Sequence, residues 1–240
     1  MSNQYLDKIQ NLPDHEKKIF LGLLEEYEES KNRKDCQEDF LCFVKQSWVA
    51  FIEGYHHTKM ADAFNRVSRG ELKRLIINMP PRHTKSEFAS YLLPAWYLGK
   101  YPDRKIIQIA HTAELAVGFG RKVRNLVGSE DFKKIFPQVA LQADSKAAGR
   151  WNTNKGGEYF AIGVGGAVTG KGADVLIIDD PHSEQEGQSG DPQVFDRVYE
   201  YYTSGPRQRL QPGGSIVIVM TRWHKRDLTG QILKAQAQRK

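Results

Sequence analysis

The sequence predicts an α/β protein with a mainly parallel central sheet between two layers of helices, preceded by a helical segment. Two observations predict this architecture. First, strand and helix alternate after Gly70: a strand over 72–79 precedes a helix over 85–98, and a strand over 104–110 precedes a helix over 112–127. Second, the strands are short apolar runs, as expected for strands that are buried on both faces. Repeated strand–helix units of this kind form parallel sheets with crossover helices.

The first 69 residues have helical rather than strand spacing. Apolar side chains recur every three to four residues over 5–30, 38–53 and 58–68, which predicts three amphipathic helices. We therefore divide the chain into a helical segment, residues 1–69, and a core, residues 70–240, on which that segment packs.

The remaining elements complete the core. Within the helix over 85–98, Pro94 predicts a kink, because proline has no backbone N–H to donate. Later in the chain we expect a hairpin with strands over 151–154 and 158–164, a glycine-rich loop over 163–172, a strand over 175–179, a helix over 191–203, a strand over 215–220 and a last helix over 228–237.

The composition is that of an ordinary globular domain. Of the 240 residues, 40% are hydrophobic and 27% charged, which excludes collagen-like and disordered classes. No apolar run reaches the ~20 residues needed to cross a bilayer, and no segment resembles a signal peptide. The two cysteines, Cys36 and Cys42, are too few for a disulfide framework. We therefore expect a soluble protein in a reducing, intracellular compartment.

The net charge of +6 is unevenly distributed along the chain. Residues 1–40 hold 10 acidic and 6 basic side chains, whereas residues 41–240 hold 19 acidic and 29 basic ones. A basic main body suits a polyanion such as DNA, because each phosphate contact releases counterions. A solvated, moderately cationic surface is an equal alternative. Candidate contacts to a DNA backbone are Lys122, Arg124, Lys133, Lys134, Arg207, Arg209, Lys225 and Arg226.

The segment 75–89 has the layout of a phosphate-binding loop. A buried strand leads into a loop and then into Lys85-Ser86 at the start of a helix. In such a layout N–H groups at the helix start contact phosphate oxygens, the lysine neutralises the β- and γ-phosphates, and the hydroxyl reaches Mg²⁺. The usual glycines are missing, because Met79 and Thr84 occupy their positions. A β-branched residue is unfavourable at positive φ, so we expect the loop to follow another path or to bind phosphate less well. The alternative is a helix that happens to begin with Lys-Ser.

Two acids close a later strand of the core. Asp179 and Asp180 directly follow the apolar run VLII. Because the carboxyl ends of parallel strands share one edge of a sheet, these acids are expected beside the loop that carries Lys85. Asp179 would then orient Mg²⁺ through its water shell, and Asp180 would polarise the attacking water. Glu184 is an alternative for the second role, because aspartate is one methylene shorter than the usual glutamate.

A third group of polar residues follows the strand over 215–220. Thr221, Arg222 and His224 are placed to sense a γ-phosphate at the same edge of the sheet. Thr221 would hydrogen-bond the phosphate, and Arg222 or His224 would couple its loss to movement. The alternative is a loop around a buried tryptophan, Trp223.

Seven segments are informative through their order and spacing along the chain. They are RLIINMPPRHTKSE after Gly70, PAW at 94–96, FGRKVR at 119–124, RWNTNKGGEYFAIGVGGAVTGKGAD at 150–174, LIIDDPHSE at 176–184, RQRL at 207–210 and TRWHKRDLTG at 221–230. In this order and spacing they resemble the ATPase part of the large subunit of tailed-bacteriophage terminases, the motors that pump viral DNA into the prohead. The resemblance spans roughly residues 38–235 and is more specific than any single motif.

The resemblance implies an additional-strand, RecA-like P-loop NTPase fold with ATP hydrolysis that depends on Mg²⁺. It also implies sequence-independent translocation of double-stranded DNA by a homo-oligomeric ring, a pentamer, docked on the portal protein. The small terminase subunit is a further implied partner, and the host cytoplasm is the implied location. Relatives continue into a nuclease domain, which we expect this chain to lack because it ends at Lys240.

The resemblance also assigns roles to single residues. Those expected to bind the nucleotide are Trp48 and His56 near the adenine, with Pro81, Arg82, His83, Thr84, Lys85, Ser86 and Glu87 around the phosphates. Those expected to bind the metal are Ser86 and Asp179. The expected catalytic residues are Asp180, Glu184, Arg82, Lys171, Thr221 and Arg222. Among these, Arg82 is the cation expected in cis, and Lys171, where relatives often have arginine, is the cation expected to reach a neighbouring subunit's site.

Three other interpretations stay open. A helicase-like P-loop ATPase would need a second RecA-like domain, for which the chain has no room. A non-catalytic or weakly active nucleotide-binding scaffold is favoured by the missing loop glycines. A zinc site formed by Cys36, Cys42, His56 and His57 has a spacing that suits no familiar zinc module.

Overall fold

The computed structural model describes residues 13–144 and 147–238, which form a three-layer α/β fold around one six-stranded sheet. The strand order is β1-β6-β5-β2-β4-β3. The first five strands in this order run parallel, and β3 pairs antiparallel with β4 at one edge. The strands are β1 (Arg74–Asn78), β2 (Lys105–Ala110), β3 (Arg150–Asn152), β4 (Glu158–Gly163), β5 (Ala173–Asp179) and β6 (Leu210–Met220).

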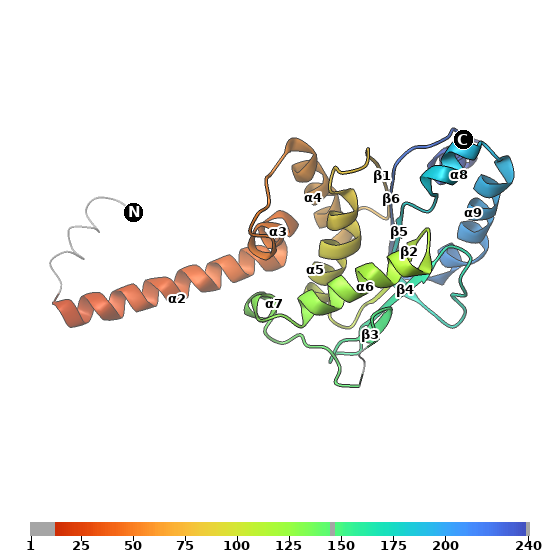
Figure 1. The fold of residues 1–240 in the computed structure, drawn as a ribbon. Helices are drawn as coiled ribbons and strands as arrows, with labels where there is room; N and C mark the ends of the chain where they lie inside the picture. The colour runs from red at the N-terminus through yellow and green to blue at the C-terminus, as the bar shows by residue number, and fades with distance from the viewer. Residues whose placement is uncertain (1–12, 145–146, 239–240) are drawn as a thin grey trace.

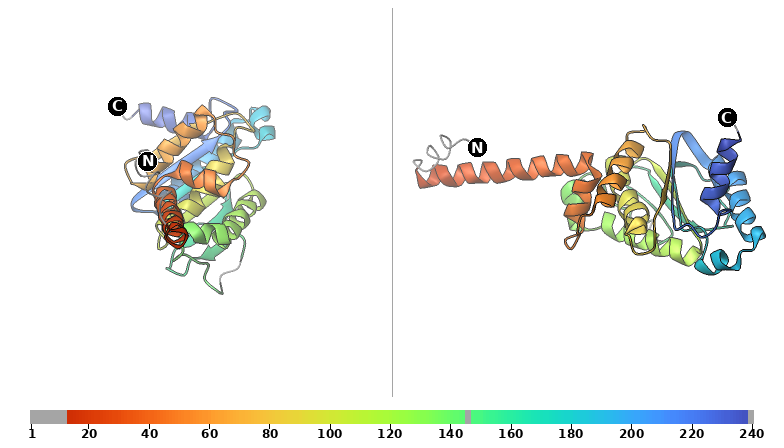
Figure 2. Two further views of the ribbon diagram at one scale, coloured as in Figure 1. Left: turned by 90° about the vertical axis from the view of Figure 1, so that its left-hand side faces the viewer. Right: turned by 90° about the horizontal axis from the view of Figure 1, so that it is seen from above.

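Helices cover both faces of the sheet (Figure 1; Figure 2, right). The first group lies on one face and comprises α2 (Asp14–Glu38), α3 (Phe40–Ser47), α4 (Tyr55–Ser68), the π-helix η1 (Glu87–Leu92), α5 (Leu93–Lys100), α6 (Ala113–Val127) and α7 (Glu130–Ile135). The second group follows β5 in the chain, and its helices α9 and α10 pack on the other face. It comprises α8 (Glu184–Ser189), α9 (Pro192–Ser204), the 3₁₀ helix η2 (Pro206–Arg209) and α10 (Leu228–Ala237).

Alternate side chains of the central strands separate the core into two halves. In β5, Val175 and Ile177 pack with the first group of helices, whereas Leu176 and Ile178 pack with α9 and α10. Every residue of β5 is buried, because successive side chains point to opposite faces and both faces are covered. The predicted mainly parallel α/β sheet is therefore confirmed.

The N-terminal helices differ from the prediction in their boundaries. α2 is one helix up to Glu38. The predicted helix over 38–53 is present but shorter, as α3 over Phe40–Ser47, because Asp39 separates it from α2 and caps it by accepting the Cys42 N–H at 2.8 Å. The part of the predicted helix over 5–30 that precedes residue 13 lies outside the described part of the chain. Figures 1 and 2 show α2 as an arm that projects from the body.

The turn between α2 and α3 joins the two cysteines. Cys36 and Cys42 form a disulfide, with their Cα atoms 4.7 Å apart. This pairing differs from the reduced state that an intracellular setting favours. It also uses both thiols of the alternative zinc site, and among the described residues no group of three or more His, Cys, Asp or Glu side chains could hold a metal ion.

None of the helices in the two described ranges is long and apolar enough to cross a membrane. α2 has the length, 25 residues, but its middle is acidic, with Glu25, Glu26, Glu28 and Glu29 close together.

The helical region after β1 begins with a π-helical segment. Pro94, which predicts a kink in this region, follows that segment. η1 over Glu87–Leu92 precedes α5, in which Pro94 occupies one of the first two positions. Because Pro94 cannot donate to the carbonyl four residues earlier, the regular α-helical pattern is interrupted there. The π turn places Ser86 and Ser90 on the same side, toward the end of β5.

Two glycines of α6 offer a matched pair of substitutions. A Cβ at Gly120 would lie 2.3 Å from the carbonyl oxygen of Ala148, whereas a Cβ at Gly118 would meet nothing within 4 Å. We expect Gly120→Ala to lower the free energy of unfolding by about 2 kcal/mol or more. We expect Gly118→Ala to raise it by up to ~1 kcal/mol through helix propensity. Urea unfolding measures both, and equal effects would contradict the packing of α6 on the segment before β3.

Candidate functional site

The carboxyl ends of β1, β5 and β6 meet at one edge of the sheet and bring the main predicted residues together. β6 lies between β1 and β5, and all three strands are parallel. The segment after β1 is the 79–86 loop, the residue after β5 is Asp180, and the residue after β6 is Thr221. This edge is where ligands bind in open parallel sheets.

Lys85 connects the 79–86 loop to the end of β5. Its Nζ lies 2.7 Å from Oδ2 of Asp180, and the residue is only 5% exposed. The other carboxylate oxygen of Asp180 accepts the Thr221 N–H at 2.8 Å, and the Thr221 hydroxyl donates to the carbonyl of Met79 at 3.2 Å. These three contacts close a ring through β1, β5 and β6. A buried ammonium needs such a partner, because an unpaired buried charge is strongly destabilising.

Asp179 is buried under a layer of hydroxyl groups. Its two oxygens accept hydrogen bonds from Ser86 Oγ at 2.9 Å and Ser90 Oγ at 2.7 Å. Ser90 in turn accepts from Nε2 of Gln108 on β2 at 3.0 Å. Burial raises the pKa of Asp179 to about 6, although the two serine hydrogen bonds oppose the shift. The carboxylate is therefore held in a fixed orientation in a place that favours a nearby cation.

Ser86 and Asp179 could bind a magnesium ion only together with ligands that the protein does not supply. Both supply oxygen atoms, which Mg²⁺ prefers, and they already touch each other. Two protein oxygens cannot complete six-fold coordination, so phosphate oxygens and water must supply the rest. This donor set is typical of Mg²⁺ that arrives with a nucleotide.

The backbone of the 79–86 loop takes the conformation that the usual glycine would allow. Arg82 has φ of 62° and Thr84 has φ of 60°, both in the left-handed region. The expected alternative path of the loop, which would avoid positive φ at Thr84, is therefore wrong, whereas weaker phosphate binding stays a prediction. Nε2 of His57, from α4, lies 2.6 Å from the Thr84 hydroxyl, which holds the strained residue in place.

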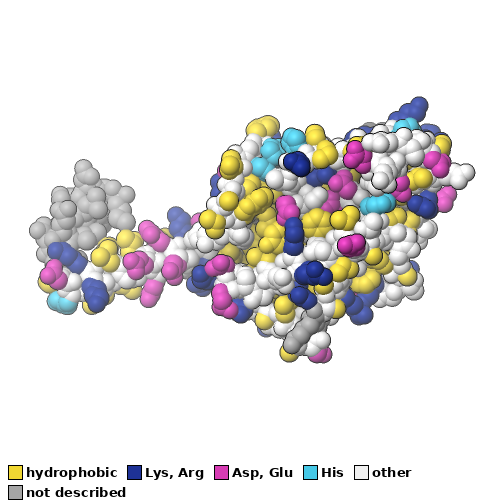
Figure 3. All heavy atoms as spheres, in the orientation of Figure 1, with side chains coloured by type: hydrophobic (Ala, Val, Ile, Leu, Met, Phe, Trp, Pro, Cys, Tyr) yellow, Lys and Arg dark blue, Asp and Glu magenta, His cyan; other side chains and the backbone are white. Residues whose placement is uncertain are grey.

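The segment between α3 and α4 lies beside this loop. The His56 ring is 3.8 Å from the His57 ring and 6.0 Å from the His83 ring, measured between centroids. Trp48 packs on Phe51 at 5.5 Å. Figure 3 shows histidine side chains gathered among hydrophobic ones over this part of the surface. His56 is therefore near the loop through His83, whereas Trp48 packs on Phe51, whose ring lies against His57 and Phe88.

The other predicted residues of the 79–86 loop face solvent. Pro81, Arg82 and His83 are exposed, and His83 Nδ1 lies 2.9 Å from the Pro81 carbonyl oxygen. Just after the loop, Glu87 forms an ion pair of 2.8 Å with Lys122 of α6. Arg82 makes no ion pair with any described residue.

Among the described residues, two predicted catalytic residues have polar partners other than Lys85 and Asp180. Glu184 begins α8, is exposed and accepts a hydrogen bond from Gln188 at 3.1 Å. Lys171 precedes β5 and pairs at 2.5 Å with Glu158, the first residue of β4. Because β4 and β5 are both parallel to β2, Lys171 and Glu158 lie at the opposite edge of the sheet.

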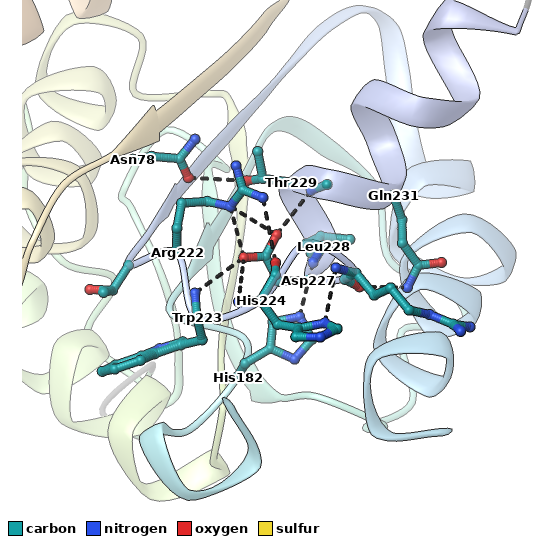
Figure 4. Close-up of polar contacts among 12 residues, drawn as sticks. Asn78, His182, Arg222, Trp223, His224, Asp227, Leu228, Thr229 and Gln231 are labelled. Carbon is teal, nitrogen blue, oxygen red and sulfur yellow. Dashed lines mark hydrogen bonds and ion pairs between the residues drawn. The ribbon is translucent and has the colours of Figure 1, made fainter. Parts of the chain in front are cut away.

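Arg222 is bound within its own chain at a buried carboxylate (Figure 4). Its Nε lies 2.8 Å and 3.0 Å from the two oxygens of Asp227, which is 0% exposed. The same carboxylate accepts backbone N–H groups of Trp223, His224 and Gly230 and so caps α10. The first turn of α10 is thereby fixed to the segment that follows β6.

α10 is also tied to the other two strand ends. The Leu228 N–H donates to Nε2 of His182, two residues after Asp180, at 3.0 Å. The Thr229 hydroxyl donates to Asn78, the last residue of β1, at 3.1 Å (Figure 4). The start of α10 therefore contacts segments that follow or end β1, β5 and β6.

Sequence reasoning missed the residues that support the site: His57, Ser90, Gln108, His182 and Asp227. One signal was available, because Gln108 interrupts the apolar run of β2 and is 0% exposed. A buried amide needs a polar partner, so it indicates a buried polar group nearby. The other four could be found only from the tertiary structure.

The strand order defines a three-layer α/β protein, and its polar residues gather at the carboxyl ends of parallel strands, the usual place for ligand sites in such sheets. No family model and no curated protein matches the chain. Among solved structures, its fold is similar to the crystal structure of the HK97 bacteriophage large terminase, with a TM-score of 0.54 and 14% sequence identity. The match covers 79% of this chain and 37% of that one, so this chain spans well under half of the matched protein. The similarity shows a mixed α/β fold with a mostly parallel sheet like that of the HK97 protein.

Asp227 provides a test of the α10 anchor. Asp227→Ala removes a helix cap and leaves the N–H groups of Trp223, His224 and Gly230 without their buried acceptor, so we expect the free energy of unfolding to fall by about 3 kcal/mol. The matched control is Asp196→Ala, which breaks a half-exposed pair with Arg226 and should cost under ~1 kcal/mol. Urea unfolding of both variants measures the difference. Similar losses for the two would show that Asp227 is only a surface partner.

Proposed function

We propose that this chain is the ATP-hydrolysing motor domain of a phage terminase large subunit, which translocates double-stranded DNA into the prohead. The observation that carries the proposal is the placement of Lys85 and Ser86 opposite Asp180 and Asp179, at 2.7 Å and 2.9 Å. A cation, a hydroxyl and two acids at the edge of a parallel sheet are the groups needed to bind a nucleoside triphosphate with its metal.

The roles of these residues follow from their chemistry. Lys85 neutralises the charge of the β- and γ-phosphates, for which its ammonium must exchange Asp180 for phosphate oxygens. The released Asp180 is then free to orient and polarise a water molecule for attack. Ser86 and Asp179 would hold a Mg²⁺ that arrives with the nucleotide, and that ion would supply further neutralisation of the phosphate charge. Arg82, exposed in the same loop, is the cation available in cis.

The order of the strands supports the additional-strand kind of P-loop fold. β6 separates the strand that carries the 79–86 loop from the strand that carries the acids. Thr221, at the end of β6, contacts both neighbours through Asp180 and Met79. When Lys85 moves to the phosphates, Thr221 and the α10 start that follows it are the first elements to respond.

The remaining parts of the proposal concern partners. A homo-oligomeric ring, a pentamer on the portal protein, would supply the trans cation, and the small terminase subunit would deliver the DNA in the host cytoplasm. Lys171 could act in trans only after it releases Glu158. The division into a helical segment, 1–69, and an ATPase core, 70–240, is part of the same proposal.

A second candidate is a non-catalytic nucleotide-binding scaffold. The observation that favours it is Thr84, a β-branched residue in a left-handed conformation in the 79–86 loop. The strain and the hydroxyl at this position both reduce the freedom of the loop to adapt to phosphates. Phosphate release distinguishes this candidate from the motor.

We expect Lys85→Ala and Asp180→Asn each to reduce Mg²⁺-dependent phosphate release from ATP by about 100-fold or more, because each removes a charge that acts in the transition state. Lys155→Ala, an exposed lysine in the β3–β4 turn, is the control and should keep the wild-type rate. The assay is run at high protein concentration so that subunits can meet. If the wild-type rate equals that of both variants, the scaffold is the better proposal.

Binding to duplex DNA should depend steeply on salt and little on sequence. On the face of the molecule drawn in Figure 3, basic side chains are scattered among acidic ones, so we expect contacts to several separate phosphates. If about four phosphates are neutralised, the affinity should fall about 100-fold between about 50 mM and about 200 mM salt. Fluorescence anisotropy with two unrelated duplexes measures this. An affinity that is flat across this range would contradict electrostatic binding.

A further inference from the structure

We propose that His57 is a positioning residue that holds the 79–86 loop in its binding conformation and so replaces the glycine that this loop lacks. This inference rests on the proposed function, because it concerns the same nucleotide site. Its basis is a chain of hydrogen bonds that begins at Gly54 and ends on the strained residue Thr84.

Thr84 needs an external restraint. Its φ of 60° lies in the left-handed region, where the Cβ of an L-residue crowds the backbone and a β-branched side chain is especially unfavourable. A glycine would adopt this conformation without strain. Lys85 and Ser86 follow directly, so a relaxation of Thr84 toward negative φ would turn both side chains away from Asp180 and Asp179.

The hydrogen bonds define which ring nitrogen of His57 carries the proton. The Gly54 N–H donates to Nδ1 at 2.8 Å, so Nδ1 is unprotonated and Nε2 carries the hydrogen. Nε2 therefore donates to the Thr84 hydroxyl oxygen at 2.6 Å. The hydroxyl hydrogen then points to the carbonyl of His83, also at 2.6 Å. In this series of hydrogen bonds, both ring nitrogens of His57 and the Thr84 hydroxyl therefore have a partner.

The imidazole itself cannot move far. His57 is 5% exposed, and its ring lies edge-on to Phe51 at 4.8 Å and stacks on Phe88 at 4.9 Å. Burial lowers the pKa of His57, which favours the neutral ring that the Gly54 contact requires. The restraint on Thr84 is therefore built on a rigid base in α4 and not on a mobile surface side chain.

The geometry predicts that His57 matters only while residue 84 carries a side-chain hydroxyl. We test this with the affinity for Mg²⁺–AMP-PNP, measured by calorimetry, for His57→Phe in two backgrounds. In the wild-type loop, His57→Phe keeps the ring packing but removes the donor, and we expect about 10-fold weaker binding. In the Thr84→Gly background the same change should alter the affinity by less than about 2-fold.

Two further variants separate the effect of the Thr84 hydroxyl on affinity from the effect of the branched side-chain shape. Thr84→Ser keeps the hydroxyl and should remain sensitive to His57→Phe. Thr84→Val keeps the branched shape without the hydroxyl and should lose affinity by itself, with no further loss when combined with His57→Phe. Circular dichroism confirms that each variant is folded. An equal loss in the threonine and glycine backgrounds, or no loss in either, would overturn the proposal.

A second readout does not need nucleotide. The Phe88 amide donates to the Thr84 carbonyl at 3.0 Å, so its hydrogen exchange reports whether residue 84 keeps its position. We expect His57→Phe to accelerate exchange of this amide in the threonine loop but not in the glycine loop. If the wild type does not bind AMP-PNP, the proposed function fails, and the exchange rates still decide the role of His57.

Discussion

The ion pair between Lys85 and Asp180 is the interaction on which the site depends. It lies where three parallel strands end, and Lys85 is buried enough that its charge cannot be left unpaired without a large cost, whereas the Asp180 side chain is 38% exposed. Because Asp180 also receives the Thr221 N–H, one carboxylate fixes the relative positions of the ends of β1, β5 and β6. The rest of the site is arranged around this point.

A second carboxylate lies one residue earlier in a different environment. Asp179 is inside the protein and receives two serine hydroxyls, whereas Asp180 lies at the rim and receives an ammonium. β5 ends at Asp179, and Asp180 follows it with a left-handed φ of 37°, so the two neighbouring carboxylates enter different surroundings. The raised pKa of Asp179 reflects burial without a cationic partner in direct contact. A divalent cation would supply that partner.

The far side of the sheet is connected to the site through the start of α10. Asp227 holds Arg222, and backbone or side-chain contacts from Leu228 and Thr229 reach the segments that follow β5 and β1. A helix anchored to three strand ends moves with them. A rearrangement at the 79–86 loop therefore has a direct physical path to the opposite layer.

The sequence by itself determined the parallel α/β fold and the residues that face one another at its edge. Buried strands have a recognisable apolar pattern, and parallel strands must end on the same side, so Lys85 and the acids of β5 could be paired in advance. The tertiary structure decided the rest. His57 is 27 residues from Thr84 in the chain, and Lys171 lies at the opposite edge because it precedes its strand. Contacts between distant segments depend on packing, which leaves no local pattern in the sequence.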